Sequence, residues 1–288
     1  IRDSFINLEN DMDIPFNINI DNIVSYLGIR RQKKIGIALG GGGAKGFSHI
    51  GVLMAMEEFG LKPQIISGVS AGSIAGVLYA SGLSPLDIKE CFMESGNFGD
   101  FTEWSIPKAG IFKLNKFAKL LDSWLPVKNI EELKIPTIVC ATNLSRGTQV
   151  GWRKGEIVPR VLASCSVPVI FNPIKIEGEY YVDGGVLHNL PAWAIRKECD
   201  VLFGSNCSPL DRKYRYRNSI LDIAARAFSL SMKANVIHDM EICDYVIKPQ
   251  EIVETKLFDL KALNRNINIG YEATCRILSE ISRSGSVK

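Results

Sequence analysis

The sequence predicts an α/β protein, folded as a three-layer α/β/α sandwich around a mostly parallel central sheet. Short apolar runs that predict buried strands alternate along the chain with longer segments of helical periodicity. This alternation is typical of a parallel sheet that is covered by helices on both faces. The composition is that of a globular chain, with 46% hydrophobic and 23% charged residues among 288. A chain of this length buries roughly three quarters of its unfolded surface, which is enough for a sizeable core.

The first half of the chain carries three signals for helix boundaries between its apolar runs. Gly60 and Gly82 follow two of the periodic segments and predict helix ends there. Ser84-Pro85-Leu86-Asp87 is a capping box with proline at the first helical position, which predicts a further helix. We therefore expect strands at residues 35–39 and 64–67, and helices at residues 46–59, 71–80 and 85–94.

The second half of the chain continues the alternation. Glu177-Gly178-Glu179 lies between two short apolar runs and predicts a β-hairpin. Pro191 predicts the start of a helix. The other strands are expected at residues 135–141, 149–152, 174–176, 180–182, 201–205 and 245–247, and the other helices at residues 156–164, 220–240 and 268–282.

Two segments depart from this pattern. Residues 1–34 are rich in Asn and Asp and end in a basic run, so we expect an N-terminal arm before one main α/β domain over residues 35–288. Within the arm, Asp21 is expected to cap a short helix that ends at Gly28. Residues 96–113 are aromatic, rich in glycine and irregular; this loop either covers an apolar groove or packs on the core.

Charge, cysteines and hydropathy limit the functional classes. A net charge of +3 is too small for the concentrated basic face of a nucleic-acid-binding protein. The seven cysteines form no C-x-x-C pair, which argues against a disulfide framework or a zinc ribbon. Residues 63–86 are uncharged, but their glycines and serines predict a buried strand, turn and helix and not a membrane span. No signal peptide is visible, so we expect a cytoplasmic protein, with peripheral membrane contact and, since the chain starts at Ile1, export left open.

The strongest chemical signal is Gly68-Val69-Ser70-Ala71-Gly72, between a predicted strand and a predicted helix. A G-x-S-x-G in that setting describes a nucleophile elbow, in which a strained turn exposes the serine oxygen and the glycines avoid collisions. The N-terminus of the following helix favours negative charge at the same place. The alternative is a chance match in a turn rich in glycine and serine.

A second glycine motif is Gly41-Gly42-Gly43-Ala44-Lys45-Gly46, again between a strand and a helix. Read as G-x-G-x-x-G it would suggest a dinucleotide site, but the next strand runs into the serine elbow and not to an acidic residue. The P-loop pattern also fails, because Lys45 precedes Gly46. Adjacent glycine N–H groups can instead point at one oxygen, as an oxyanion hole requires.

The third motif is Asp183-Gly184-Gly185, directly after a predicted strand. Taken alone, Asp-Gly is most often only a turn. Its interpretation as a functional motif depends on the presence of the other two motifs in the same chain.

The three motifs, in this order, resemble the patatin-like phospholipase family. The stretch from Ala163 to Pro168, with Phe171 beyond it, resembles the family's approach to the aspartate. The resemblance implies a patatin-like fold and a lipid acyl hydrolase that uses Ser70 as nucleophile and Asp183 as base, without metal or cofactor. It implies an oxyanion hole at Gly41, Gly42 and Gly43, and supporting roles for Lys45, Gly46, Gly68, Gly72, Gly184 and Gly185. The implied partner is a phospholipid or other acyl lipid, with transient membrane contact and no nucleic acid.

Two alternatives remain open at this point. A Ser–His–Asp esterase acting on small soluble esters would recruit His188 or His238, although the first is close to Asp183 and the second is expected on a helix surface. His49 is expected on the face of the helix after the glycine loop. The second alternative is a non-catalytic lipid-binding regulatory protein. The basic and aromatic stretch from Asp211 to Arg217 is either a solvated loop or a contact with anionic lipid head groups.

Overall fold

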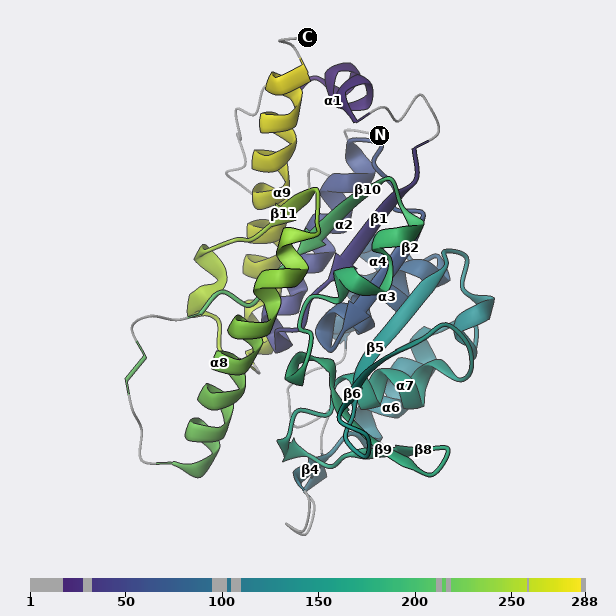
Figure 1. The fold of residues 1–288 in the computed structure, drawn as a ribbon, viewed down its shortest axis with the longest axis vertical. Coiled ribbons are helices and arrows are strands. Elements are labelled where there is room, and N and C mark those ends of the chain that lie inside the picture. Colours follow the sequence, from purple (N-terminus) through teal and green to yellow (C-terminus); the bar gives the residue numbers. More distant parts are fainter. Residues whose placement is uncertain are drawn as a thin grey trace.

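Figure 1 shows the computed structural model of the chain. It describes residues 18–27, 33–94, 103–104, 110–210, 214–215, 219–257 and 259–285. The predicted three-layer α/β/α fold is confirmed: a central sheet is flanked by helices on both faces.

The central sheet is mostly parallel. Its order is β11-β10-β1-β2-β5-β9-β8, and β6 pairs with β5 beside this path. The strands from β11 to β5 are parallel to their neighbours, whereas β9, β8 and β6 run antiparallel. The strands are β1 (Ile35–Leu39), β2 (Ile65–Val69), β5 (Thr137–Asn143), β6 (Thr148–Trp152), β8 (Ile174–Ile176), β9 (Glu179–Asp183), β10 (Val201–Ser205) and β11 (Tyr245–Ile247).

The parallel strands are buried on both faces, which explains their continuous apolar sequences. Successive side chains of a strand point to opposite faces, so Ile37 and Leu39 join one core while Ala38 joins the other. The first core lies under α2 (Ser48–Glu58), α3 (Ala71–Ser81), α4 (Pro85–Glu94), α7 (Ile157–Ser164) and α9 (Leu263–Gly285). The second lies under α8 (Ile220–Glu241) and two 3-10 helices, Pro191–Ala194 and Arg196–Glu198.

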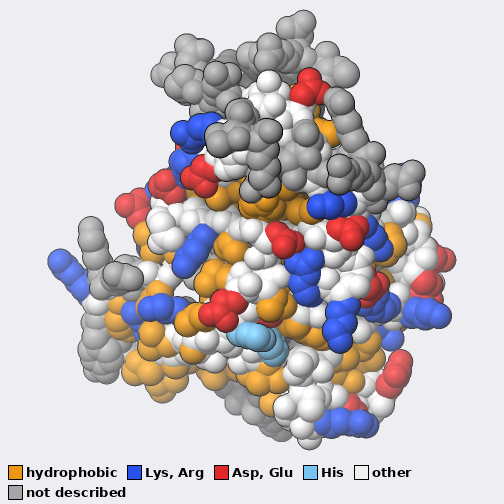
Figure 2. Space-filling model, turned by 45° about the horizontal axis from the view of Figure 1, so that its top comes forward, with side chains coloured by type: hydrophobic (Ala, Val, Ile, Leu, Met, Phe, Trp, Pro, Cys, Tyr) orange, Lys and Arg blue, Asp and Glu red, His pale blue; other side chains and the backbone are white. Residues whose placement is uncertain are grey.

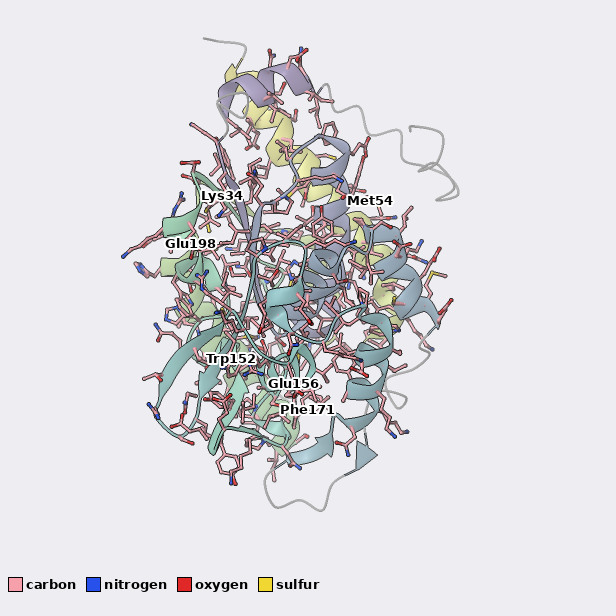
Figure 3. The ribbon with its side chains drawn as sticks, turned by 90° about the vertical axis from the view of Figure 1, so that its right-hand side faces the viewer. Lys34, Met54, Trp152, Glu156, Phe171 and Glu198 are labelled. Carbon is pink, nitrogen blue, oxygen red and sulfur yellow. The ribbon has the colours of Figure 1, made fainter. Side chains whose placement is uncertain are left out.

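The two covering layers are visible in Figure 3, where Met54 of α2 lies on the side of α9 and Glu198 lies on the opposite side of the sheet. Figure 1 shows α8 along the left of the molecule and α1 (Ile20–Tyr26) at its top, beside α9. A small second sheet has the order β3 (Glu103–Trp104), β4 (Gly110–Lys113) and β7 (Val169–Phe171). Within the described residues, no helix is long and apolar enough to cross a membrane.

The predicted strands and most of the predicted helices are present, with differences at particular ends. A 3-10 helix, Gly43–Phe47, precedes α2, and the helix expected from Pro191 is only a 3-10 turn because the chain must reach β10 a few residues later. Helix α9 begins at Leu263, before the predicted start. The N-cap assigned to Asp21 is wrong, because the Asn19 side chain accepts the hydrogen bond from Asn22 N.

Helix α6 (Asn115–Trp124) and the small second sheet lie where the sequence suggested irregular chain or no element. Several predictions fall outside the described residues: Gly28, most of the basic run after it, and most of the loops 96–113 and 211–217. Four further 3-10 helices span Ile130–Glu132, Gly184–Val186, Glu251–Glu254 and Leu260–Ala262.

Candidate active site

Strand β5 brings the ends of β2 and β9 together. Val69, the last residue of β2, pairs with Cys140, and Asp183, the last residue of β9, pairs with Ala141. Cys140 and Ala141 also pair with β6, which occupies the opposite edge of β5. Strands β2 and β9 therefore both lie on the remaining edge of β5, where the end of one meets the end of the other. Residues remote in sequence, Ser70 and Asp183, are thereby placed side by side.

Ser70 sits on the predicted elbow. Its backbone has φ 52° and ψ −125°, a left-handed φ that is uncommon for a residue other than glycine. The turn is held by α3, because Ser73 N and the Ser73 hydroxyl both donate to the Ser70 carbonyl, at 2.8 and 2.7 Å. A Cβ on Gly68 would lie 2.5 Å from Gly72 O, and one on Gly72 would overlap the Leu39 carbonyl. The two glycines of the motif are therefore required by close backbone packing.

A buried hydroxyl, that of Ser164 at the end of α7, holds the elbow to the sheet. It accepts a hydrogen bond from Ser70 N at 2.8 Å and donates one to Cys140 O at 2.6 Å. This bridge fixes the nucleophile's amide against β5. From the sequence, Ser164 is expected only in the approach to Asp183, because its bond to the elbow exists only in the folded chain.

Asp183 is buried at the end of β9. Its Oδ1 accepts a hydrogen bond from Gly185 N at 2.8 Å. Its Oδ2 is also buried and has no hydrogen bond of normal geometry to any described residue. Burial raises the pKa of this carboxyl to about 7, while the hydrogen bond from Gly185 and the nearby Ser70 hydroxyl lower it. The carboxyl is thus poised between its two protonation states near neutral pH, as a general base requires.

The glycine loop reaches the same place from the end of β1. Gly40 N donates to Ser205 O and Gly41 N donates to Asn189 O, both at 3.0 Å. Among the described residues, the next two amides, of Gly42 and Gly43, have no protein acceptor. Gly43 adopts φ 57°, and a Cβ there would overlap the Leu257 carbonyl. Two adjacent N–H groups are therefore available beside Ser70.

His49 supports this loop from beneath. It is fully buried and bonds to Gly40 O at 2.8 Å through Nε2 and to the Ser205 hydroxyl at 2.9 Å through Nδ1. Because a carbonyl only accepts, Nε2 carries the proton. Burial lowers the pKa of His49 to about 4, against the opposing effect of the Gly40 hydrogen bond, so the ring is neutral at pH 7. The expectation of a simple helix-face residue is corrected: His49 braces the loop.

Two asparagines that the sequence analysis did not single out tie the loop to the aspartate motif. Asn189 Nδ2 donates to Gly41 O at 3.2 Å, and Asn189 N donates to Asn235 Oδ1 at 3.1 Å. Asn235 of α8 in turn donates to Gly185 O at 2.8 Å. Neither residue belongs to a recognisable motif, so their roles follow only from the fold.

The remaining predicted motif residues lie around this centre. A Cβ on Gly46 would overlap that of Ala71, the residue after the nucleophile, so the loop packs directly on the elbow. A Cβ on Gly184 would lie 2.8 Å from Val69 Cγ2, and one on Gly185 would lie 2.9 Å from Asn189 Oδ1. Lys45 lies on the loop and lowers the pKa of Cys207 behind it, against the larger raising effect of that thiol's burial.

Ser70 and Asp183 open into an apolar pocket that encloses about 1000 Å³, including its open mouth. Phe47 and Phe92 form one wall, with ring centroids 5.1 Å apart. Phe171, labelled in Figure 3, and two α8 residues, Phe228 and Met232, line it as well.

The other candidate groups do not reach Ser70. His238 is 75% exposed on α8, and His188 bonds through Nδ1 to Asp239 Oδ2 at 2.9 Å. With His49 beneath the loop, the structure brings none of the three histidines to Ser70 or Asp183. Cys165 lines the pocket beside them, but burial, followed by the charge of Asp183, raises the pKa of its thiol far above neutrality. In the part of the chain that is described, no cluster of His, Cys, Asp and Glu could hold a metal ion.

Comparison with known proteins agrees with this geometry. The chain is 30% identical over 173 residues to an uncharacterized NTE family protein of Mycobacterium tuberculosis, covering 55% of this chain and 44% of that protein. It is 32% identical over 170 residues to the lysophospholipase NTE1 of Cryptococcus neoformans var. neoformans, covering 57% of this chain and 10% of that protein. The chain thus spans less than half the length of these curated relatives.

Among solved structures, VipD from Legionella pneumophila is similar in fold, with a TM-score of 0.51 and 17% identity over 86% of this chain and 67% of that one. Residues 37–195 match the family described as patatin-like phospholipase. This region is more than half of the chain and holds the glycine loop, the serine elbow and the aspartate motif in their order. The chain belongs to the patatin-like phospholipase family.

Proposed function

We propose that the chain is a lipid acyl hydrolase of the phospholipase A type, which cleaves carboxylic ester bonds of phospholipids with Ser70 as nucleophile and Asp183 as its base. The observation that carries the proposal is the meeting of β2 and β9 on one edge of β5, which puts these two residues together at the floor of an apolar pocket. Membership of the patatin-like family supports the same chemistry.

In the acylation step, Asp183 accepts the proton of the Ser70 hydroxyl while Oγ attacks the ester carbonyl carbon. The negative charge moves to the carbonyl oxygen, where the N–H groups of Gly42 and Gly43 receive it. The Gly41 amide is already bonded to Asn189 O, so we assign the oxyanion hole to the following two glycines. Collapse of the intermediate breaks the ester C–O bond, and Asp183 returns the proton to the leaving alcohol.

Deacylation repeats these roles with water. Asp183 takes a proton from a water molecule, the hydroxide attacks the acyl–Ser70 ester, and the proton returns to Ser70 as the fatty acid is released. The carboxyl that performs both transfers has a pKa of about 7. Its position near neutrality allows it to accept a proton and also to return one.

The pocket supports a long acyl chain as the bound group. Apart from Ser70, Asp183 and backbone amides, its walls are apolar or aromatic. Burying methylene groups there contributes roughly 0.8 kcal/mol each, which favours lipids over short soluble esters. The triad esterase is disfavoured because His188 is bound to Asp239 and His238 faces solvent.

The test is hydrolysis of phospholipid in mixed micelles, followed by mass spectrometry of the products, together with labelling by a fluorophosphonate. Ser70→Ala and Asp183→Asn should each lower kcat by about 10³-fold or more, because the two residues act as one unit. Ser81→Ala is the matched control, since the hydroxyl of this buried serine of α3 bonds to Leu78 O in its own helix. Full turnover by either active-site variant removes the mechanism, and an unlabelled Ser70 in the parent protein favours a non-catalytic lipid-binding protein.

A further inference from the structure

Helix α8 exposes an apolar stripe along its outer face. Four large apolar side chains of this helix are strongly exposed: Ile220 (81%), Ile223 (46%), Leu230 (47%) and Ile237 (51%). Ala227 and Ala234 are also exposed and fill the positions between them. The spacing alternates between three and four residues, so the six side chains form one continuous line along the helix. Monomeric proteins seldom expose a contiguous apolar surface without a partner for it.

The opposite face of the same helix forms part of the candidate active site. Phe228 and Met232 line the pocket, and Asn235 holds the carbonyl of Gly185. Val169, whose side chain is also exposed, belongs to β7, which packs against α8. The stripe therefore lies on the outer side of the wall that encloses the substrate pocket.

The charges beside the stripe indicate what covers it. Arg226 and Lys233 are the two charged residues on α8 between Ile223 and Ile237, and both are basic; the exposed Glu241 at the end of the helix lies beside His238. Arg215, just before the helix, is exposed as well. The nearby Asp222 is bonded to the Tyr214 hydroxyl at 2.5 Å. Figure 2 shows hydrophobic side chains on the lower left of the molecule, where α8 lies in Figure 1, with Lys and Arg side chains next to them.

A second copy of this helix fits the stripe poorly. Paired helices usually place opposite charges beside the apolar seam, whereas an antiparallel α8 pair centred on the middle of the stripe, near Leu230, would bring Arg226 of one copy towards Lys233 of the other. A surface that combines apolar chains with negative head groups matches both features. Amphipathic helices that lie on membranes have this combination of apolar and basic side chains.

We propose that the outer face of α8 docks the protein on an anionic lipid bilayer, with Ile220, Ile223, Leu230 and Ile237 in the acyl–headgroup boundary and Arg226 and Lys233 at the head groups. The inference rests on the proposed function, since it supplies the surface from which a lipid would enter the pocket. It adds the partner surface that the pocket alone does not define.

The test is co-sedimentation of the full chain, carrying Ser70→Ala so that lipid is not consumed, with phosphatidylcholine vesicles that do or do not contain phosphatidylglycerol. The parent protein should bind the anionic vesicles more tightly. The triple variant Ile223→Gln, Leu230→Gln and Ile237→Gln should lose roughly tenfold or more of this affinity, because three half-exposed apolar side chains no longer enter the bilayer. Lys233→Glu should lose about fivefold, on anionic vesicles only.

Ile20→Gln is the matched control, because Ile20 of α1 is 45% exposed and α1 packs on α9 at the top of Figure 1. It should bind vesicles as the parent does. Absence of binding by the parent, equal binding by the triple variant, or a dimer in solution that the triple variant dissociates overturns the proposal.

Hydrolysis of p-nitrophenyl butyrate by proteins with Ser70 intact separates the two proposals. The triple variant should retain the parent's rate on this monomeric ester, since its three side chains face away from the pocket. Vesicle binding without any ester hydrolysis would contradict the proposed function and leave the docking surface standing. If the triple variant alone lost both vesicle binding and ester hydrolysis, the three substitutions would have unfolded α8. The outer face of α8 would then be part of the packed structure and not a free docking surface, which overturns the proposal.

Discussion

The two halves of the candidate active site are held in different ways. The turn at the nucleophile is set mainly by its own segment, because Ser70 follows β2 directly, α3 begins at the next residue and Ser73 bonds to the Ser70 carbonyl; Ser164 then ties the Ser70 amide to β5. The aspartate is held by remote parts of the chain: Asp183 N donates to Ser166 O, its strand pairs with β5, and the following loop is held by Asn235 of α8. A short motif can therefore specify an elbow, whereas the position of a base beside it depends on tertiary contacts.

The largest effect on stability is expected from a substitution in the serine elbow. In Gly72→Ala, the new methyl group would overlap the Leu39 carbonyl of β1, so the elbow must leave the sheet. We expect a loss of about 3 kcal/mol or more in the free energy of unfolding, measured by urea denaturation. Gly76→Ala, one turn along α3, is the matched control, since its nearest neighbour would be Ile66 Cγ2 at 3.2 Å. Equal stability of the two variants would contradict the packing argument.

The burial of Asp183, the half of the site held by remote contacts, should make both activity and stability depend on pH. Because burial raises the pKa of Asp183 to about 7 from an ordinary value of 3.8, kcat/KM should rise with pH through about 7 as the base ionises. The same shift lowers stability as pH rises from about 4 to 7, since the unfolded carboxyl ionises first. Asp183→Asn should therefore be more stable than the parent at pH 8, by on the order of 2 kcal/mol, and this difference should vanish near pH 4.

Thermal unfolding of both proteins across this pH range measures the stability difference, and a pH–rate profile of the parent measures the ionisation. A rate that is independent of pH between 6 and 8, roughly one unit either side of the expected value, would show that Asp183 is not the titrating base.

A smaller loss of stability and activity is expected from Ser164, whose hydroxyl ties the serine elbow to β5. Ser164→Ala removes the hydroxyl between Ser70 N and Cys140 O and leaves a buried N–H without its acceptor. We expect a loss of about 1–3 kcal/mol in stability, together with a kcat lowered by roughly tenfold as the elbow shifts. Ser81→Ala, which removes a buried hydroxyl elsewhere, should keep the parent's kcat. A matching decrease in both variants would show that Ser164 has no particular role in positioning Ser70.

The smallest effect is expected from His238→Ala. This side chain is largely exposed, so stability should change by less than about 0.5 kcal/mol and kcat should stay within about twofold. His188→Ala is the informative contrast, because it leaves the buried Asp239 carboxyl without its partner and should lower stability while sparing the chemistry. Loss of nearly all turnover in His238→Ala would restore the triad interpretation.

The sequence predicted the regular parts of the fold well, because buried parallel strands are continuous apolar runs and glycines mark the ends of their helices. Strand β1 has the predicted bounds, and the capping box predicted at the start of α4 forms between Ser84 and Asp87. Helix α6 was missed although Phe117, Leu121 and Trp124 are spaced for one helix face. The aromatic and glycine-rich chain before it obscured that signal.

The site was predictable only as a set of separate motifs. The roles of Ser164 and Asn189 had no signal, because each depends on atoms from distant strands that meet only in the folded chain. The state of the glycine triplet is also set by the fold: the Gly41 amide bonds to Asn189 O, and the Gly42 and Gly43 amides have no acceptor among the described residues.

By itself, the sequence determined the local geometry: the strained turn at Ser70, the glycines that permit close packing, and the alternation that builds a covered sheet. The tertiary structure decided which remote groups share the site. Strand pairing along β5 places Asp183 against the end of β2, and the packing of α8 presents one face to the pocket and leaves the other exposed. Local backbone preferences are set by neighbouring residues, whereas strand register, burial and the resulting pKa are properties of the assembled core.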